Sequence, residues 1–208
     1  MLIKAPLAVM AACIVGVAPL GCTSSSGAQR IDTTTSTMMS VEDQIEQGER
    51  RLDALIVSLN TLDATQDYDR SYRDFDRRVR DVKATAERIR SRRVEMETQA
   101  AEHMTLWRSE SASLTRERTQ EITAERQQAF EESINRATEA LDDLHAEYEE
   151  FLSRVDEVRT VLSNDLTRQG VEMTREIRGD VVDMARDLQA TSKDVRETVR
   201  EARTDFTR

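Results

Sequence analysis

The sequence predicts an all-α fold of long amphipathic helices, and three observations predict it. Of the 208 residues, 38% are hydrophobic and 34% are charged, whereas an ordinary domain is about 45–50% apolar and about 25% charged. Two prolines and six glycines are too few to supply the turns of a β protein. Apolar residues recur at three- and four-residue spacing, as in helices that pack along one face. We therefore expect an elongated antiparallel coiled-coil helical hairpin or three-helix bundle.

The first 21 residues have the layout of a secretory signal peptide. Lys4 precedes an apolar stretch over residues 5–20, and Gly21 and Cys22 follow. A charged start, a short apolar segment and a small residue at the cleavage site are typical of such signals. A membrane-spanning helix, the competing interpretation, needs about 20 apolar residues, but a proline and a glycine end this stretch early. We expect residues 1–21 to direct export.

The end of this segment, Leu20-Gly21-Cys22, resembles the lipobox of bacterial lipoproteins. The resemblance implies acylation of Cys22 and a membrane partner reached through this lipid anchor, although Pro19 stands where the family usually has leucine. The alternative is ordinary cleavage nearby, which leaves Cys22 as a free thiol or removes it. Thr23 stands where lipoproteins retained at the inner membrane carry aspartate, which implies the periplasmic face of the outer membrane. If Cys22 is acylated and Cys13 is removed with the signal peptide, the mature chain has no free thiol, and an exported protein then has no unpaired cysteine to explain.

Three further segments follow from composition and period. Residues 22–39 are Ser/Thr-rich without an apolar period and are predicted to be a flexible tether behind the acylated cysteine. A capping-box-like pattern at Ser40 begins the helical part. Residues 40–165 are predicted to form an antiparallel helical coiled-coil domain, with a turn or kink at 63–67, where the apolar stripe slips by one residue, and a hairpin bend within 108–129.

The two long helical blocks carry matching apolar seams. The second block runs from Tyr68 to Trp107 in an unbroken 4-3 series, in which every position except Arg93 and His103 is apolar. The third runs from Phe130 to Leu162. Such seams are typical of helix-on-helix packing, and folding the chain back near residue 118 would lay Trp107 against Phe130.

Residues 166–208 are predicted to be a C-terminal amphipathic helix of 11-residue repeats that protrudes beyond the hairpin. Its apolar stripe is the candidate interaction face, for a second copy of the chain or another envelope protein: Leu166, Met173, Ile177, Val181, Met184, Leu188, Val195, Val199 and Phe206. Two alternatives remain open, namely that the stripe binds a membrane surface or that it folds back on the first helix.

The residues predict no site for chemistry. A formal charge of −10 argues against nucleic acid as a partner, because phosphate binding needs clustered positive charge. His103 is interpreted as a core or rim residue, and His145 as a surface residue on an acidic face. Asp67 and Asp69 resemble only the start of a calcium loop. We therefore predict no catalytic residue, no cofactor, no metal, no cleft and no small-molecule substrate.

With these blocks placed, the chain resembles a family of bacterial helical lipoproteins catalogued as a domain of unknown function. The resemblance is carried by the stretch from Ala101 to Trp107, by Phe151-Leu152, by the stretch from Val161 to Leu166, and by Gly170-Val171. It implies long antiparallel helices and no activity. The general plan also resembles the murein-linked outer-membrane lipoprotein, but Arg208 stands where that protein has its cell-wall-linked lysine.

Taken together, these patterns predict a non-catalytic, lipid-anchored coiled-coil protein of the periplasm that acts as a structural spacer or protein-binding scaffold at the cell envelope. The alternative is a module whose C-terminal amphipathic helix binds lipid for envelope lipid transport or membrane remodelling.

Overall fold

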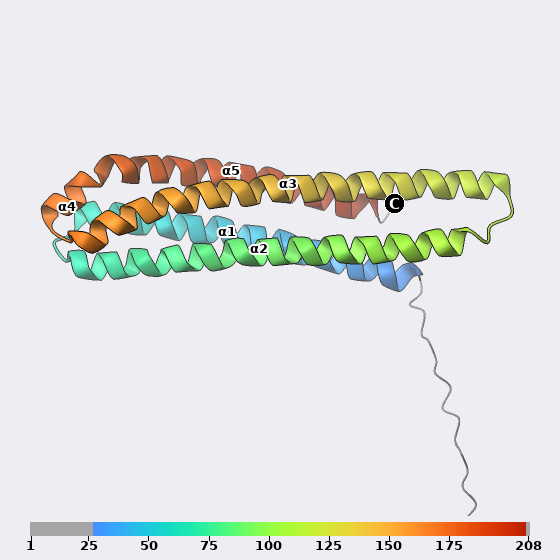
Figure 1. The fold of residues 1–208 in the computed structure, drawn as a ribbon, viewed down its shortest axis with the longest axis horizontal. Coiled ribbons are helices and arrows are strands. Elements are labelled where there is room, and N and C mark those ends of the chain that lie inside the picture. Colours follow the sequence, from blue (N-terminus) through green and yellow to red (C-terminus); the bar gives the residue numbers. More distant parts are fainter. Residues whose placement is uncertain (1–26, 207–208) are drawn as a thin grey trace, which may run out of the picture.

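The computed structural model describes residues 27–206, and in this range the chain forms an elongated bundle of antiparallel helices without strands. The helices are α1 (Gly27–Ala64), α2 (Tyr68–Ser111), α3 (Glu117–Asn164), the short α4 (Arg168–Met173) and α5 (Arg175–Asp205). Helix α1 packs beside α2 and α5, and α3 packs beside the same two helices (Figure 1). The predicted all-α elongated bundle is confirmed, with four long helices around one core. The predicted signal peptide over residues 1–21, the predicted acylation site Cys22 and the C-terminal Arg208 lie outside the described residues.

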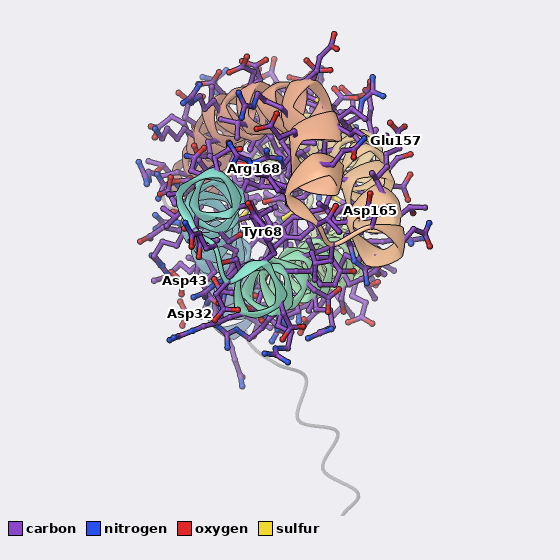
Figure 2. All side chains as sticks on the ribbon, turned by 90° about the vertical axis from the view of Figure 1, so that its left-hand side faces the viewer. Asp32, Asp43, Tyr68, Glu157, Asp165 and Arg168 are labelled. Carbon is purple, nitrogen blue, oxygen red and sulfur yellow. The ribbon has the colours of Figure 1, made fainter. Side chains whose placement is uncertain are left out.

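The core of the bundle is a set of seams with 4-3 spacing, one from each long helix. Its largest fully buried side chains include Phe75, Tyr148 and Phe151. Viewed along the bundle axis, charged side chains such as Asp43 and Glu157 point outward around the periphery (Figure 2). No helix in residues 27–206 is long and apolar enough to span a membrane.

Helix α1 begins earlier than the sequence predicted, so the flexible tether and the helix start at Ser40 are wrong for residues 27–39. Thr34, Thr37 and Met38 are buried and continue the seam toward the N-terminus. The hydroxyl of Thr34 donates to the carbonyl oxygen of Arg30 at 3.1 Å, which satisfies its polar group inside a helix. Threonines at seam positions therefore conceal an apolar period while still packing in the core.

Both predicted chain reversals are confirmed. Helix α1 ends at Ala64 and α2 begins at Tyr68, with Asp67 capping α2 through a hydrogen bond from the backbone N–H of Arg70 at 3.1 Å. The second reversal joins α2 to α3 across residues 112–116.

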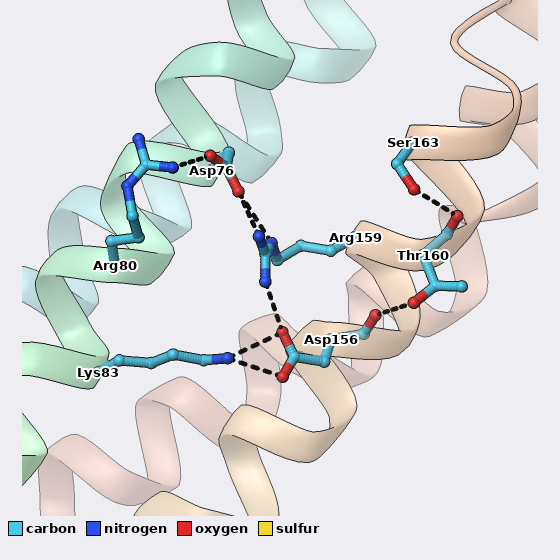
Figure 3. A network of polar contacts seen from close by, with 7 residues as sticks. All are labelled: Asp76, Arg80, Lys83, Asp156, Arg159, Thr160 and Ser163. Carbon is cyan, nitrogen blue, oxygen red and sulfur yellow. Dashed lines mark hydrogen bonds and ion pairs between the residues drawn. The ribbon is translucent and has the colours of Figure 1, made fainter.

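The predicted pairing of α2 with α3 is also confirmed. The rings of Trp107 and Phe130 lie edge to face with centroids 6.2 Å apart. Farther along, Lys83 Nζ donates to Asp156 at 2.8 Å and Arg159 bonds Asp76 at 2.7 Å, so the two helices keep the same register over many turns (Figure 3).

The predicted protrusion of the C-terminal helix is wrong, because α5 packs along α1 and α3. The alternative, that the stripe folds back on the first helix, is confirmed. The chain reverses around α4, where the Thr167 hydroxyl accepts a hydrogen bond from the N–H of Gly170 at 3.3 Å. Gly170 is required there because a Cβ atom would overlap the carbonyl oxygen of Asp165. What does protrude is the α2–α3 hairpin, which runs past the start of α1 and the end of α5 (Figure 1).

The buried face of α5 also repeats every seven residues rather than eleven, so the predicted 11-residue geometry is wrong. From the residue that precedes the helix, Thr174, the buried positions are spaced 4-3 throughout: Thr174, Arg178, Val181, Ala185, Leu188, Ser192, Val195, Val199 and Ala202. Three of these side chains are polar and two are alanines, which conceals the heptad from a hydropathy pattern.

One end of the bundle is formed by the α1–α2 turn and by α4, and we call it the closed end. Arg178 is 4% exposed there and donates to the carbonyl oxygens of Leu59 and Val171, each at 3.1 Å. It also bonds both carboxylate oxygens of Asp63, at 2.7 and 3.0 Å, and the hydroxyl of Thr174 at 3.1 Å. The hydrogen bond from Arg178 outweighs partial burial and lowers the pKa of Asp63. One buried guanidinium thus joins α1, α4 and α5.

Candidate functional site

The opposite end of the bundle, which we call the open end, holds a cavity of about 390 Å³. Four helices contribute to it because α1 begins and α5 ends against the α2–α3 hairpin. The lining residues from α2 are spaced i, i+4 and i+7, which places them on one helix face, and those from α3 are spaced i, i+3 and i+4. The full lining is Gly27, Arg30, Ile31, His103, Trp107, Glu110, Arg126, Ala129, Phe130, Asp205 and Phe206. We call it the open-end cavity.

An aromatic cluster forms one wall of the open-end cavity. The rings of His103 and Phe130 are stacked, with centroids 5.0 Å apart and an interplanar angle of 12°. Trp107 meets both rings edge to face, at 5.7 Å from His103 and 6.2 Å from Phe130. Phe206 lies 4.5 Å from Phe130, centroid to centroid. The wall therefore joins α2, α3 and the end of α5 through geometries that aromatic pairs favour.

Charged groups complete the cavity, and the carboxylates among them are paired. Arg30, 9% exposed, bonds Glu110 at 2.6 Å. Asp205 accepts a hydrogen bond from the Ser133 hydroxyl at 3.1 Å and lies 3.6 Å from the guanidinium of Arg136.

The histidine of the aromatic wall is held in its neutral form. His103 is 6% exposed, and burial, helped by the nearby positive charge of Arg30, lowers its pKa, although Glu110 acts in the opposite direction. Its Nδ1 atom has no hydrogen-bond partner among the described residues. At neutral pH the ring therefore contributes an uncharged aromatic surface with one unused polar atom.

The size and lining of the open-end cavity are typical of a small-molecule binding site. The cavity volume is within the usual range for small-molecule sites, about 300–1,000 Å³, and such sites combine apolar walls with a few polar groups. In residues 27–206, no group of three or more His, Cys, Asp or Glu side chains is arranged to hold a metal ion. His145, considered above as a surface residue, lies 3.3 Å from Glu149 on the same helix.

The predicted interaction face is divided by the structure. Val181, Leu188, Val195 and Val199 are buried in the bundle core. Leu166, Ile177, Met184 and Phe206 are partly buried and pack against the core. Met173, in contrast, is 66% exposed. Phe206 is the one member of this face that lines the open-end cavity.

Sequence reasoning missed the cavity, since it predicted no cleft. His103, Trp107 and Phe130 were recognised only as seam positions, whereas Arg30 and Arg126 were not singled out at all. The available signal was the concentration of aromatic residues at the ends of seams, Trp107 and Phe130 on either side of the bend and Phe206 at the end of the last block.

No protein-family model matches the chain, and no curated protein or solved structure is significantly similar to it. Functional inference therefore depends on the residues and geometry of this chain.

Proposed function

We propose that this protein is a lipid-anchored spacer and binding scaffold at the periplasmic face of the bacterial outer membrane, acylated at Cys22. The observation that carries the proposal is the position of the start of α1. Gly27 is the fifth residue after Cys22 and lies at the open end of the bundle. Five residues span at most about 17 Å, so an anchor at Cys22 would hold the open end beside the membrane.

The length and surface of the bundle are consistent with a spacer. Helix α3 has 48 residues and is therefore about 72 Å long at 1.5 Å per residue, so an upright bundle would carry its closed end that far from the bilayer. Its exposed large apolar residues are scattered over several helices, and charged side chains such as Asp43 and Glu157 point outward around its periphery (Figure 2). A surface of this kind favours weak or polar contacts with envelope proteins over insertion into lipid.

A structural role for the protein is also supported by two carboxylates, Asp63 and Asp156, whose pKa values are lowered by hydrogen bonds from basic residues. The pKa of Asp63 is lowered by its hydrogen bond from Arg178. Burial alone would raise the pKa of Asp156, but hydrogen bonds from Lys83 and Arg159 outweigh it and lower that pKa. Both carboxylates thus serve ion pairs between helices, whereas paired catalytic carboxylates have pKa values that their environments push apart.

The alternative function, lipid binding by residues 166–208, would require α5 to leave the bundle. Its apolar face is covered by α1 and α3, and releasing it would expose the core. An interaction with a second copy through the same face would carry the same cost. We therefore assign partner binding to the outer surface of the folded bundle.

Two measurements test the anchored-spacer proposal. Mass spectrometry of the membrane fraction should find acyl chains on Cys22, and Cys22→Ala should release the protein, whereas Cys13→Ala should not. For orientation, a fluorophore attached at Ser113→Cys, in the α2–α3 turn, should be quenched by a lipid-bound quencher, while the same fluorophore at Thr65→Cys, in the α1–α2 turn, should not. An unmodified Cys22, or equal quenching at both ends, would contradict the proposal.

A further inference from the structure

The open-end cavity has the properties of a ligand site, and we propose that it binds a single-chain amphiphile with an anionic head group, such as a long-chain carboxylate. This inference goes beyond the scaffold function. It depends on the cavity alone and not on whether Cys22 is acylated.

The apolar part of such a ligand has a matching surface. Trp107, Phe130 and Phe206 contribute three rings from three different helices, and Ile31 and Ala129 add aliphatic surface. Trp107 and Phe206 are only partly buried, so apolar ring surface remains available to a ligand. Covering that surface with a hydrocarbon chain is favourable because apolar area is removed from water on both partners. A volume of about 390 Å³ is at the lower end of the range for ligand sites, which favours a single chain.

The choice of an anionic head group follows from the pairing of the lining charges. The carboxylate of Glu110 is bonded by Arg30 at 2.6 Å. The carboxylate of Asp205 lies 3.6 Å from Arg136 and accepts a hydrogen bond as well. Among the described residues, Arg126 is the lining charge without an ion pair, and it is exposed at the rim. A guanidinium there can form two parallel hydrogen bonds to a carboxylate.

Aromatic walls also suit cations, so a cationic ligand is the competing possibility. The carboxylates of Glu110 and Asp205 argue against a cationic ligand because both are already paired with arginines. A cation in the cavity would therefore meet the positive charge of Arg126 and no unpaired negative charge. His103 is kept neutral by burial and so adds no charge to the wall. The ring of His103 stacks on Phe130 and is thus a part of the apolar surface.

The sole tryptophan of the chain, Trp107, lies in this wall and reports on binding without a label. The experiment uses the full-length Cys22→Ser chain, which keeps every described residue and cannot be acylated. Dodecanoate, titrated below its micelle concentration, should shift the Trp107 emission saturably. Dodecyltrimethylammonium should bind at least tenfold more weakly. No saturable shift with dodecanoate, or equal affinity for the two probes, would overturn the proposal.

Variants separate the head-group contact from the apolar contact. Arg126→Ala should weaken dodecanoate binding at least tenfold and leave dodecanol binding unchanged, whereas Phe206→Ala should weaken both. Arg118→Ala is the matched control, because Arg118 lies on the same helix, is exposed and pairs with Glu121 at 3.2 Å outside the cavity. Helical circular dichroism checks that each variant is folded. Dodecanoate binding that is insensitive to Arg126→Ala, or equally sensitive to Arg118→Ala, would refute the assignment of the head group.

Discussion

The two ends of the bundle each contain a buried arginine, and the two arginines are used differently. At the closed end, Arg178 of α5 bonds two carbonyl oxygens, a hydroxyl and both oxygens of one carboxylate, which belong to α1, α4 and the residue between α4 and α5. At the open end, Arg30 bonds Glu110, whose side chain is 56% exposed and belongs to the protruding hairpin. The first arginine closes the bundle between α1, α4 and α5. The second leaves a cavity beside it.

The contrast between the two arginines indicates that a bundle of similar long helices can form a binding site at its ends. Long helices packed by 4-3 seams fill their middle, and only their ends can depart from that packing. One end here is filled by Arg178 and its hydrogen bonds to α1 and α4. The other is left partly open because four helices finish at different levels (Figure 1). Stability is therefore expected to be concentrated at the closed end, and binding at the open end.

Replacing the two arginines gives the strongest contrast. Arg178→Ala should destabilise the protein by about 3–5 kcal/mol, the usual cost of removing one partner of a buried ion pair. Arg30→Ala should cost about 1 kcal/mol, since its carboxylate partner is largely solvated. Urea denaturation followed by circular dichroism measures both. Equal losses would contradict the contrast between the two ends.

The middle of the bundle offers the next largest effect. Gly48 of α1 faces Tyr148 of α3, and a Cβ atom at Gly48 would overlap the Tyr148 hydroxyl. Tyr148 is 1% exposed, so neighbouring side chains enclose its ring and leave it little room to move aside. The same burial raises the pKa of Tyr148 to about 12. Gly48→Ala should therefore cost about 1–3 kcal/mol through overpacking, although alanine is the better helix former by about 1 kcal/mol.

A matched second substitution tests that explanation. Tyr148→Phe removes the hydroxyl that the new methyl group would meet, so the double variant Gly48→Ala/Tyr148→Phe should recover most of the loss. Gly179→Ala is the control, because nothing lies within 4 Å of a Cβ atom there; it should stabilise the protein slightly. If Gly48→Ala were stabilising, the close approach of α1 and α3 at this level would be wrong.

The parts of the fold that could be predicted are the helices whose apolar residues recur with regular 4-3 spacing. The seams from Tyr68 to Trp107 and from Phe130 to Leu162 predicted the α2–α3 hairpin and its register. The path of α5 was not predictable in the same way, because Arg178 and Ser192 occupy its seam and their burial depends on partners distant in the sequence. The early start of α1 was concealed by threonines for a similar reason. The cavity depends on where four helices stop relative to one another, which no local pattern encodes.

Acidification should affect the open end before the closed end. Because the folded-state pKa of His103 is lowered from 6.5, the unfolded chain binds more protons just below that pH. The stability that neutral His103 contributes is therefore complete above about pH 6.5 and is lost as the pH falls through the folded-state pKa of His103. The free energy of unfolding should decrease from pH 7 to pH 5, by less than Gly48→Ala costs. His103→Leu should remove most of this slope and His145→Leu should not; a slope that persists in His103→Leu would assign it to other groups.

The smallest effect is expected from the surface network between α2 and α3, which belongs to neither end (Figure 3). Lys83 Nζ donates to both oxygens of Asp156, at 2.8 and 3.1 Å, but the two side chains are 40% and 44% exposed. Water and salt screen such a pair, so Lys83→Ala should cost less than about 1 kcal/mol, and the loss should shrink at high ionic strength. Since the pKa of Asp156 is lowered from 3.8, this contribution is present above about pH 4 and disappears in stronger acid. A loss as large as that of Arg178→Ala would mean that burial is not what distinguishes the closed end from the rest of the bundle.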